Sequence, residues 1–484
     1  MADIFEGLKP EPLWKHFAKI LSVPRCSGKE KAMGDYIAAA GKAAGLVVKR
    51  DEVGNVCVEK PASPGREKAP GVILQCHQDM VCEKNSDVAF DFAKDTIRAR
   101  LKDGWVQAQG TTLGADNGIG IAACLAVMED KSLIHGPLEF LCTIDEERGL
   151  TGANKIKAGF LKGTRLLNLD SEEEGAFTIG CSGGADTELA LALKRKKARG
   201  KSVLRELKIS GLRGGHSGID INQGRGNAIK ILARLLWQAQ QKFGLEIVRL
   251  EAGSKRNAIP REAWAHFLVA PGEVDRLSAF LSEAFAKVKD ENKVVETELK
   301  YSFEKAKGTA APLAPASQKA LLNFLLALPH GVLAMHPEIA GLVETSTNLA
   351  IVSVKKAQAQ VICSSRSSIG SALEAVKNGL KALADLAQAK AKLSDGYPGW
   401  APNLQSRLLK TLKDLHLKVF GKAAAVAAIH AGLECGIIGE KFPGMDMISF
   451  GPTIQHPHSP EERVNAESVE HFWKFLTAAL ESLS

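Results

Sequence analysis

Short apolar runs and helical patterns alternate along the first part of the chain. The runs at 72–76, 138–144 and 166–169 are short and mostly apolar, which is typical of strands buried on both faces of a sheet. Residues 11–50 and 118–128 repeat apolar side chains at helical spacing, and small residues in 118–128 favour close packing on a sheet. Strands that alternate with helices predict an α/β fold with a covered central sheet.

The pattern changes near residue 185 and becomes typical of an α+β domain. Elements are predicted there at 187–193, 204–210, 227–242, 247–250, 263–268, 274–290 and 373–391. From residue 396 the α/β pattern returns with a helix over 403–420. We therefore predict a catalytic domain made of residues 1–185 and 394–484, with a second domain, 186–393, inserted between its halves.

Composition places the chain among ordinary globular proteins. A length of 484 residues favours two domains, and 45% hydrophobic with 24% charged residues excludes disordered and fibrous classes. The net charge of +8 is mild for this length, and we predict no nucleic-acid partner. The densest basic run, Lys194–Lys201, lies between two predicted strands, and we interpret it as a solvated hairpin tip.

Cysteine usage and hydropathy favour the cytoplasm. The nine cysteines form no C-x-x-C motif, several lie inside apolar strands, and we predict buried, reduced thiols. The N-terminal segment carries charges throughout and has no apolar signal core. The longest charge-free run, 320–337, contains Asn323, His330 and two prolines, so we expect no membrane span.

Acidic and histidine side chains follow the predicted strands. His77 and Asp79 come after the first apolar run, Glu146 and Glu147 after the second, and Asp170 after the third; Asp116 lies at a helix entrance. Ligands of α/β sheets bind beyond the carboxyl ends of the strands, so these groups are expected at one edge. Such residues bind divalent cations and activate water, which predicts a two-metal hydrolase site.

Spacing suggests roles within this set. Side chains two apart in an extended segment point the same way, so His77 can ligate while Asp79 orients its imidazole. Of the adjacent Glu146 and Glu147, one can bind metal while the other acts as general base. Each motif alone has an ordinary structural explanation, such as a solvated strand end or a capping aspartate, but their ordered combination does not.

Several segments carry a family resemblance. QCHQDMV, TTLGADNGIG, TIDEERGLTGA, LNLDSEE, GGHSGIDI, RNAIPRE, HAGLECG and HSP resemble the aminoacylase- and carnosinase-like dinuclear zinc metallopeptidases, over nearly the whole chain. The resemblance implies a zinc-peptidase-like catalytic domain with an inserted lid and dimerisation domain, and therefore a homodimer. It also implies two bound divalent metal ions. The expected metal is zinc, and manganese and cobalt are the alternatives.

The resemblance assigns ligands. Asp116 would bridge the two ions, with His77 and Asp170 on one and Glu147 and a C-terminal histidine on the other. We choose His458 over His456 because it precedes Ser-Pro, as in the family motif. Glu146 would be the general base, and Asp79 would orient His77.

The resemblance also implies substrate-binding residues: His216, Asn257, Arg366, Gly432 and Glu434. In relatives the histidine at the His216 position reaches the partner's active site and stabilises the oxyanion. Taken alone, His216 could make its hydrogen bonds within its own turn, and Arg366 could form a structural ion pair. The implied activity is hydrolysis of Xaa-Xaa dipeptides, including Xaa-His of the β-alanyl-histidine type. Alternatives are an N-acyl amino acid deacylase or carboxypeptidase of the same family, or a catalytically silent binding protein.

Overall fold

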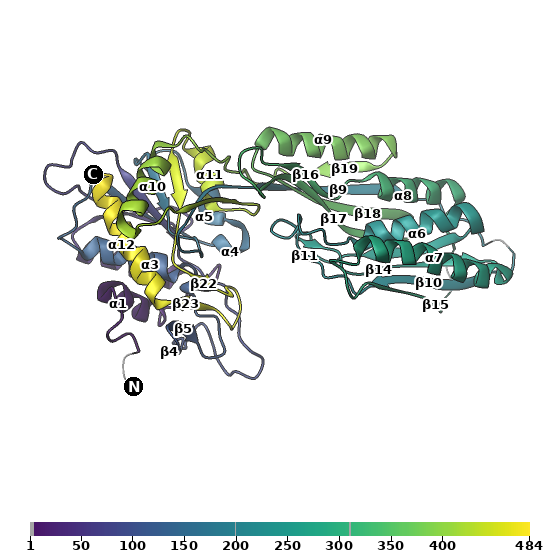
Figure 1. Ribbon diagram of the computed structural model, residues 1–484, viewed down its shortest axis with the longest axis horizontal. Coiled ribbons are helices and arrows are strands. Elements are labelled where there is room, and N and C mark those ends of the chain that lie inside the picture. The colour runs from purple at the N-terminus through teal and green to yellow at the C-terminus, as the bar shows by residue number, and fades with distance from the viewer. Residues whose placement is uncertain (1–3, 199, 309–310) are drawn as a thin grey trace. The chain divides into compact units, whose positions relative to one another are not determined.

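The computed structural model describes residues 4–198, 200–308 and 311–484, and they form two compact units (Figure 1). The first unit contains the residues up to Cys181 together with Trp400–Ala428 and Leu433–Ser484. The second contains Ser182–Gly399 and Ile429–Gly432. The chain therefore leaves the first unit after Cys181 to build most of the second, returns at Trp400, and adds the short segment Ile429–Gly432 to the second unit before it ends in the first.

The first unit is built on a mixed sheet with the strand order β1-β2-β6-β3-β7-β21-β8-β20. Strands β6, β3, β7 and β21 are parallel, while β2 and β8 flank them in antiparallel pairs. The strands are β1 Val47–Arg50, β2 Val56–Lys60, β3 Val72–His77, β6 Leu138–Thr143, β7 Arg165–Asn168, β8 Ala176–Cys181, β20 Ala425–Ile429 and β21 Asp446–Ser449.

Helices and a small sheet complete this unit. The helices are α1 Glu11–Ile20, α2 Lys31–Ala43, α3 Ala115–Glu129, α4 Glu146–Gly149, α5 Thr151–Lys155, α10 Arg407–Phe420, α11 Glu434–Lys441 and α12 Ala466–Ser482. The small sheet has the order β22-β23-β5-β4, with β4 Ala99–Lys102, β5 Trp105–Ala108, β22 Ile454–Gln455 and β23 Arg463–Asn465.

The central strands are covered on both faces, as the sequence predicts. Every residue of β3 and β6 is buried. On one face of β3, Leu74 and Cys76 join the hydrophobic core that α1, α3 and α12 complete, and on the other Gln75 meets Glu434 of α11. A Cβ at Gly120 of α3 would lie 3.1 Å from the Cβ of Cys76, so this small residue allows α3 to pack closely on β3. These contacts confirm the predicted α/β fold.

The second unit contains an antiparallel sheet with the order β15-β10-β14-β12-β17-β18-β9-β19, and β16 pairs with β17. Buried residues alternate with partly exposed ones along β14, so one sheet face is covered. The strands are β9 Gly183–Ala192, β10 Val203–Ser210, β11 Gly215–His216, β12 Glu246–Ala252, β13 Ala258–Ile259, β14 Ala263–Val269, β15 Lys300–Lys305, β16 Gly331–Met335, β17 Val343–Lys355, β18 Gln358–Ser367 and β19 Lys390–Leu393.

Helices α6 Ala228–Phe243, α7 Val274–Asn292, α8 Pro315–Ala327 and α9 Gly370–Leu386 pack on strands of this sheet, and a short 3-10 helix, Pro271–Glu273, precedes α7. The helix predicted over 373–391 ends earlier than expected. Gln388 has a φ of 57°, which a right-handed helix cannot continue, and the chain then enters β19.

The predicted hairpin tip at Lys194–Lys201 is wrong. Strand β9 lies between β18 and β19, whereas β10 lies between β14 and β15, so the basic run connects strands that are not neighbours. Its backbone packs on other elements instead, because Lys194 N donates to Ser317 Oγ at 2.8 Å. Pairing with β18, which follows much later in the chain, determines the position of β9. Arg199 lies outside the described residues.

The prediction of nine reduced cysteines is wrong for one pair. Cys26 and Cys82 form a disulfide, with their Cα atoms 5.6 Å apart. A β-bridge between Cys26 and Met80 brings the two segments together, which the sequence spacing does not reveal. The other cysteines, all in the described part of the chain, are buried and free. Among the described residues, none of the helices has the length and apolar character needed to cross a membrane.

Candidate metal centre

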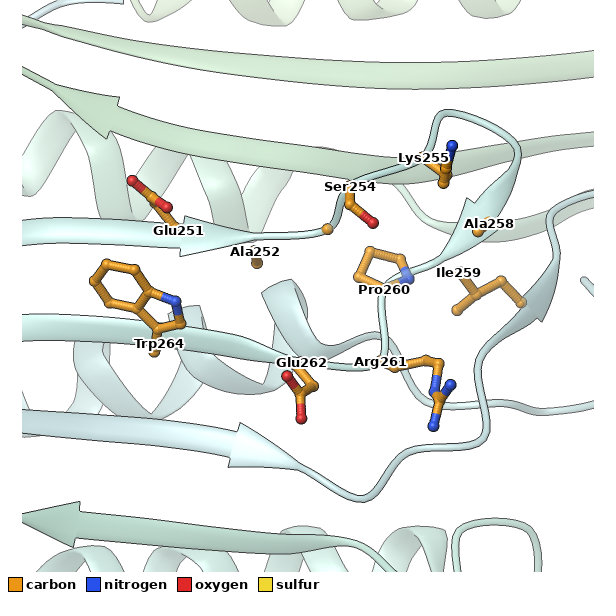
Figure 2. Close-up of a pocket in the computed structure, with 11 residues that line it drawn as sticks. Glu251, Ala252, Ser254, Lys255, Ala258, Ile259, Pro260, Arg261, Glu262 and Trp264 are labelled. Carbon is orange, nitrogen blue, oxygen red and sulfur yellow. The ribbon is translucent and has the colours of Figure 1, made fainter. Parts of the chain in front are cut away.

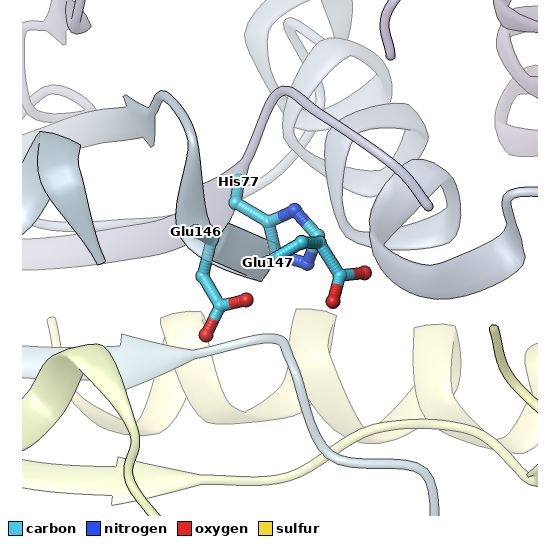
Figure 3. A group of neighbouring side chains, drawn as sticks. All are labelled: His77, Glu146 and Glu147. Carbon is cyan, nitrogen blue, oxygen red and sulfur yellow. The ribbon is translucent and has the colours of Figure 1, made fainter. Parts of the chain in front are cut away.

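The predicted ligands meet at the carboxyl edge of three adjacent parallel strands. His77 ends β3, Glu146 and Glu147 follow β6, and Asp170 follows β7. The two glutamates are not extended, because Asp145 has a φ of 49° and Glu146 starts the short helix α4. Ligand atoms of His77, Glu146 and Glu147 nevertheless lie within 4.8 Å of one another (Figure 3).

Asp116 belongs to two groups of potential metal ligands. The first group is His77, Asp116 and Asp170; the second is Asp116, Glu147 and His458. Asp116 Oδ1 lies 3.0 Å from His77 Nε2, and Asp116 Oδ2 lies 3.1 Å from His458 Nε2. The two oxygens of one carboxylate thus face different histidines, which is the arrangement that a carboxylate bridging two cations requires.

The outer members of each group are equally close. His77 Nε2 lies 3.3 Å from Asp170 Oδ1, and His458 Nε2 lies 3.0 Å from Glu147 Oε2. His456 belongs to neither group in the described chain. The geometry therefore favours His458 over His456 as the C-terminal ligand.

Asp79 lies behind the cluster and is fully buried. Its Oδ1 lies 3.3 Å from His77 Nδ1, at ion-pair distance. The same carboxylate accepts hydrogen bonds from the backbone N of Glu146 at 3.0 Å and of Glu147 at 3.3 Å. Asp79 is thus placed to orient both the imidazole and the start of α4.

The electrostatics of the cluster favour a bound cation. Hydrogen bonds to Asp116 and Glu147 raise the pKa of His458 to about 11. Burial raises the pKa of Asp170 to about 6, and burial with nearby carboxylates raises the pKa of Glu146 well above its ordinary value. Glu147 Oε1 is buried and has no hydrogen-bond partner among the residues that the structure describes. Carboxylate oxygens and imidazole nitrogens are ligands that zinc, manganese and cobalt accept, so the residues fit a pair of divalent cations.

Sequence reasoning missed several residues that support the ligands. Asn117 Nδ2 donates to Asp170 Oδ1 at 2.6 Å and to Leu169 O at 2.8 Å, so it links the Asp116 loop to the end of β7. Arg25 and Glu462 hold the same loop through its backbone. An asparagine directly after Asp116 was a visible signal, but nothing in the sequence around Arg25 or Glu462 indicated their partners.

Two of the predicted substrate-binding residues meet in the second unit. His216 Nε2 of β11 lies 3.4 Å from Arg366 Nη2 of β18, and Arg366 Nη1 donates to Tyr397 Oη at 2.9 Å. Gly432 lies against the same tyrosine, because a Cβ there would be 2.8 Å from its ring. Burial lowers the pKa of His216, and the Arg366 cation lowers it further.

The remaining predicted residues are Glu434 in the first unit and Asn257 in the second. Glu434 is buried, and its Oε2 accepts hydrogen bonds from Gln75 Nε2 and Thr143 Oγ1, both at 2.6 Å. Asn257 is exposed in the loop between β12 and β13. Residues on both sides of it in the chain, including Lys255 and Ala258, line a cavity of about 490 Å³ whose wall includes Trp264 (Figure 2).

Known proteins resemble this chain over almost its full length. Cytosol non-specific dipeptidase of Escherichia coli (strain K12) is 41% identical over 476 residues, which cover 98% of each protein. The crystal structure of aminoacylhistidine dipeptidase from Vibrio alginolyticus has 43% identity and a TM-score of 0.92, covering 99% of this chain and 97% of that one. Aminopeptidase PepT from Bacillus cereus ATCC 10987 shares the fold, with a TM-score of 0.58 at 15% identity over 98% of this chain and 99% of that one.

A family model agrees with these similarities and with the family resemblance found in the motifs. The model of peptidase family M20/M25/M40 matches residues 73–482, a span that includes the clustered ligands from His77 to His458. The chain therefore belongs to peptidase family M20/M25/M40.

Proposed function

We propose that the protein is a metal-dependent dipeptidase that hydrolyses Xaa-Xaa dipeptides, including Xaa-His of the β-alanyl-histidine type. The observation that carries the proposal is the position of the Asp116 carboxylate. One of its oxygens faces His77 and the other faces His458, so Asp116 belongs to two ligand groups, and Glu146 lies close to His77. The similarity to cytosol non-specific dipeptidase and to aminoacylhistidine dipeptidase supports this substrate class.

His77, Asp116 and Asp170 would hold one ion, and Asp116, Glu147 and His458 the other. We propose zinc, with manganese and cobalt as alternatives that the same ligands accept. When bound, such ions polarise the scissile carbonyl and lower the pKa of water.

Glu146 is the proposed general base. Its carboxylate lies within the same cluster as His77 and Glu147, yet it belongs to neither group that contains Asp116. Its raised pKa suits a group that takes a proton from water and returns it to the leaving amine. Asp79, which holds the backbone N of Glu146, would keep this carboxylate in place.

His216 and Arg366 are proposed to bind a negatively charged part of the substrate. His216 Nδ1 accepts hydrogen bonds from the backbone N of Gly218 and Ile219, so the ring proton is assigned to Nε2. Nε2 and Arg366 Nη2 are then two donors 3.4 Å apart, and Arg366 Nε is buried with no hydrogen-bond partner in the described part of the chain. Such an arrangement suits a carboxylate or a developing oxyanion.

Glu434 is proposed to recognise the free amino group of a dipeptide. Its Oε1 is buried and has no hydrogen-bond partner within the described residues. The carboxyl lies close enough to His77 and Asp170 for their charges to affect its pKa. A carboxyl at this place would favour an ammonium over an acyl group. This favours a dipeptidase over the deacylase of the same family.

We also propose that Asn257 and Gly432 border the substrate, that the second unit serves as lid and dimerisation domain, and that the protein is a cytoplasmic homodimer. The cytosolic relative supports the location.

A small substrate panel tests the activity. Purified protein with zinc, manganese or cobalt is assayed with Ala-His, β-alanyl-histidine, acetylornithine and a tripeptide. We expect cleavage of the two dipeptides. Cleavage of acetylornithine alone would support the deacylase alternative, and cleavage of none, with less than one ion bound per chain, would support a silent binding protein.

A further inference from the structure

One buried carboxylate holds the loop that precedes α3. Glu462 Oε2 accepts hydrogen bonds from the backbone N of Leu113 and Gly114, both at 2.8 Å. Glu462 Oε1 accepts from the backbone N of Ala115 at 2.7 Å and of Asp116 at 3.2 Å. The side chain is 2% exposed, so water does not compete for these four consecutive N–H groups.

Arg25 holds the same loop through a carbonyl group. Its Nη2 donates to Gly114 O, and its Nη1 donates to Asp79 O at 2.6 Å. Burial lowers the pKa of Arg25, and the nearby carboxylate of Glu462 is the largest influence opposing this shift. Gly114 has a φ of 72°, and a Cβ there would lie 2.8 Å from Met80 Sδ, so the loop has little room to shift.

Glu462 also connects the two ends of the metal cluster. It lies four positions after His458, in the segment that β23 continues, while its carboxylate binds the backbone of Asp116. Backbone N–H groups cannot ligate a cation, and Glu462 belongs to no ligand group in the described chain. The contacts of Glu462 therefore determine the position of the Asp116 backbone, and they do not bind a cation directly.

We propose that Glu462 is a positioning residue for the metal centre. By fixing the backbone of residues 113–116, it sets the Asp116 carboxylate between the His77 and His458 groups, so that retention of both cations depends on it. The inference rests on the proposed two-metal function. Its simpler rival is a cap of α3 that stabilises the fold without affecting metal affinity.

Substitution separates the two roles. Glu462→Gln keeps the shape but places an amide NH₂ against backbone N–H donors, so part of the loop loses its acceptor. Glu461→Gln removes the same charge from the exposed neighbouring residue and is the matched control. Chelator-treated full-length proteins are titrated with cobalt(II), and equilibrium dialysis gives the affinities while visible absorption reports ligand geometry.

We expect Glu462→Gln to lose at least about tenfold in affinity for the weaker-bound cobalt and to change the absorption spectrum, as loss of a residue that orients a ligand does. Glu461→Gln should match the wild type. If Glu462→Gln binds two ions with wild-type affinity and spectrum, the proposal is wrong, even when its metal-free form melts earlier.

A second, milder variant keeps the proposal testable if Glu462→Gln does not fold. Glu462→Asp keeps the carboxylate but shortens its reach, and we expect a smaller loss of affinity. Unchanged binding in this variant, or failure of both variants to fold, would identify Glu462 as a structural cap only. Wild-type protein that binds fewer than two ions would instead contradict the proposed function.

Discussion

The imidazole of His458 lies 3.1 Å from the carboxylate of Asp116, although 342 positions separate them in the chain. The other oxygen of the same carboxylate lies 3.0 Å from His77. Asp116 therefore joins a group from the first half of the chain to a residue near its C-terminus. Loss of Asp116 should affect both cation sites, whereas loss of an outer ligand should affect one.

This relationship predicts a graded loss of metal. Asp116→Ala removes the shared ligand, so the purified variant should retain less than one ion per chain. His458→Ala removes a ligand of one group only and should retain about one ion. Elemental analysis after dialysis against trace zinc measures both values.

His456→Ala is the control for this series. It removes a nearby imidazole that belongs to neither ligand group in the described residues, so two ions should remain. One ion in His456→Ala with two in His458→Ala would reverse the assignment of the C-terminal ligand.

Glu146→Ala should separate metal binding from turnover. Glu146 belongs to neither group that contains Asp116, so both ions should remain bound. Turnover should fall by about a thousandfold, in the range expected when a general base is removed. Steady-state assays with Ala-His, together with metal analysis of the same sample, check this. Near-normal turnover would end the general-base assignment.

The grouping of His77, Glu146 and Asp170 could be predicted because each lies at the end of, or just after, a short apolar strand. Apolar runs indicate that β3, β6 and β7 are central strands, and their parallel pairing brings His77, Glu146 and Asp170 to one edge. The choice of His458 over His456 rested on the family motif, and only the folded chain brings His458 to Asp116.

Contacts made by backbone groups could not be predicted. Glu462 appears in the sequence as one of two glutamates in a polar turn, and its four partners are N–H groups 346 to 349 positions away. Strand order in the second unit is similarly non-local. Strand β9 pairs with β18 rather than with β10, the next long strand in the chain, so the hairpin expected at 194–201 did not follow.

Arg366→Ala should weaken binding of the substrate's carboxylate end. We expect KM for Ala-His to rise on the order of tenfold to a hundredfold, the usual effect of losing a hydrogen bond to a charged group. Ala-His amide lacks that carboxylate, so its KM should change little on substitution. Equal effects on both substrates would indicate a structural role for Arg366, through its contact with Tyr397.

Glu434 should make the stability of the metal-free protein depend on pH. Burial raises its pKa from 4.5 to about 8 in the folded chain. Between these values the unfolded chain has lost the proton and the folded chain retains it. The stabilising contribution is therefore complete below the unfolded pKa and is lost as pH rises through the folded pKa.

Glu434→Gln removes this titration and keeps a side chain of the same shape. We expect the stability of the variant relative to wild type, measured as the difference in the free energy needed to unfold them, to be greater at about pH 8.5 than at about pH 5, because only the wild type must bury a charge at high pH. Urea unfolding of chelator-treated proteins at both values measures the difference. Glu440→Gln, an exposed position in the same helix, is the control and should show no such change. A difference between Glu434→Gln and wild type that is the same at both pH values would mean that Glu434 is already ionised in the folded chain.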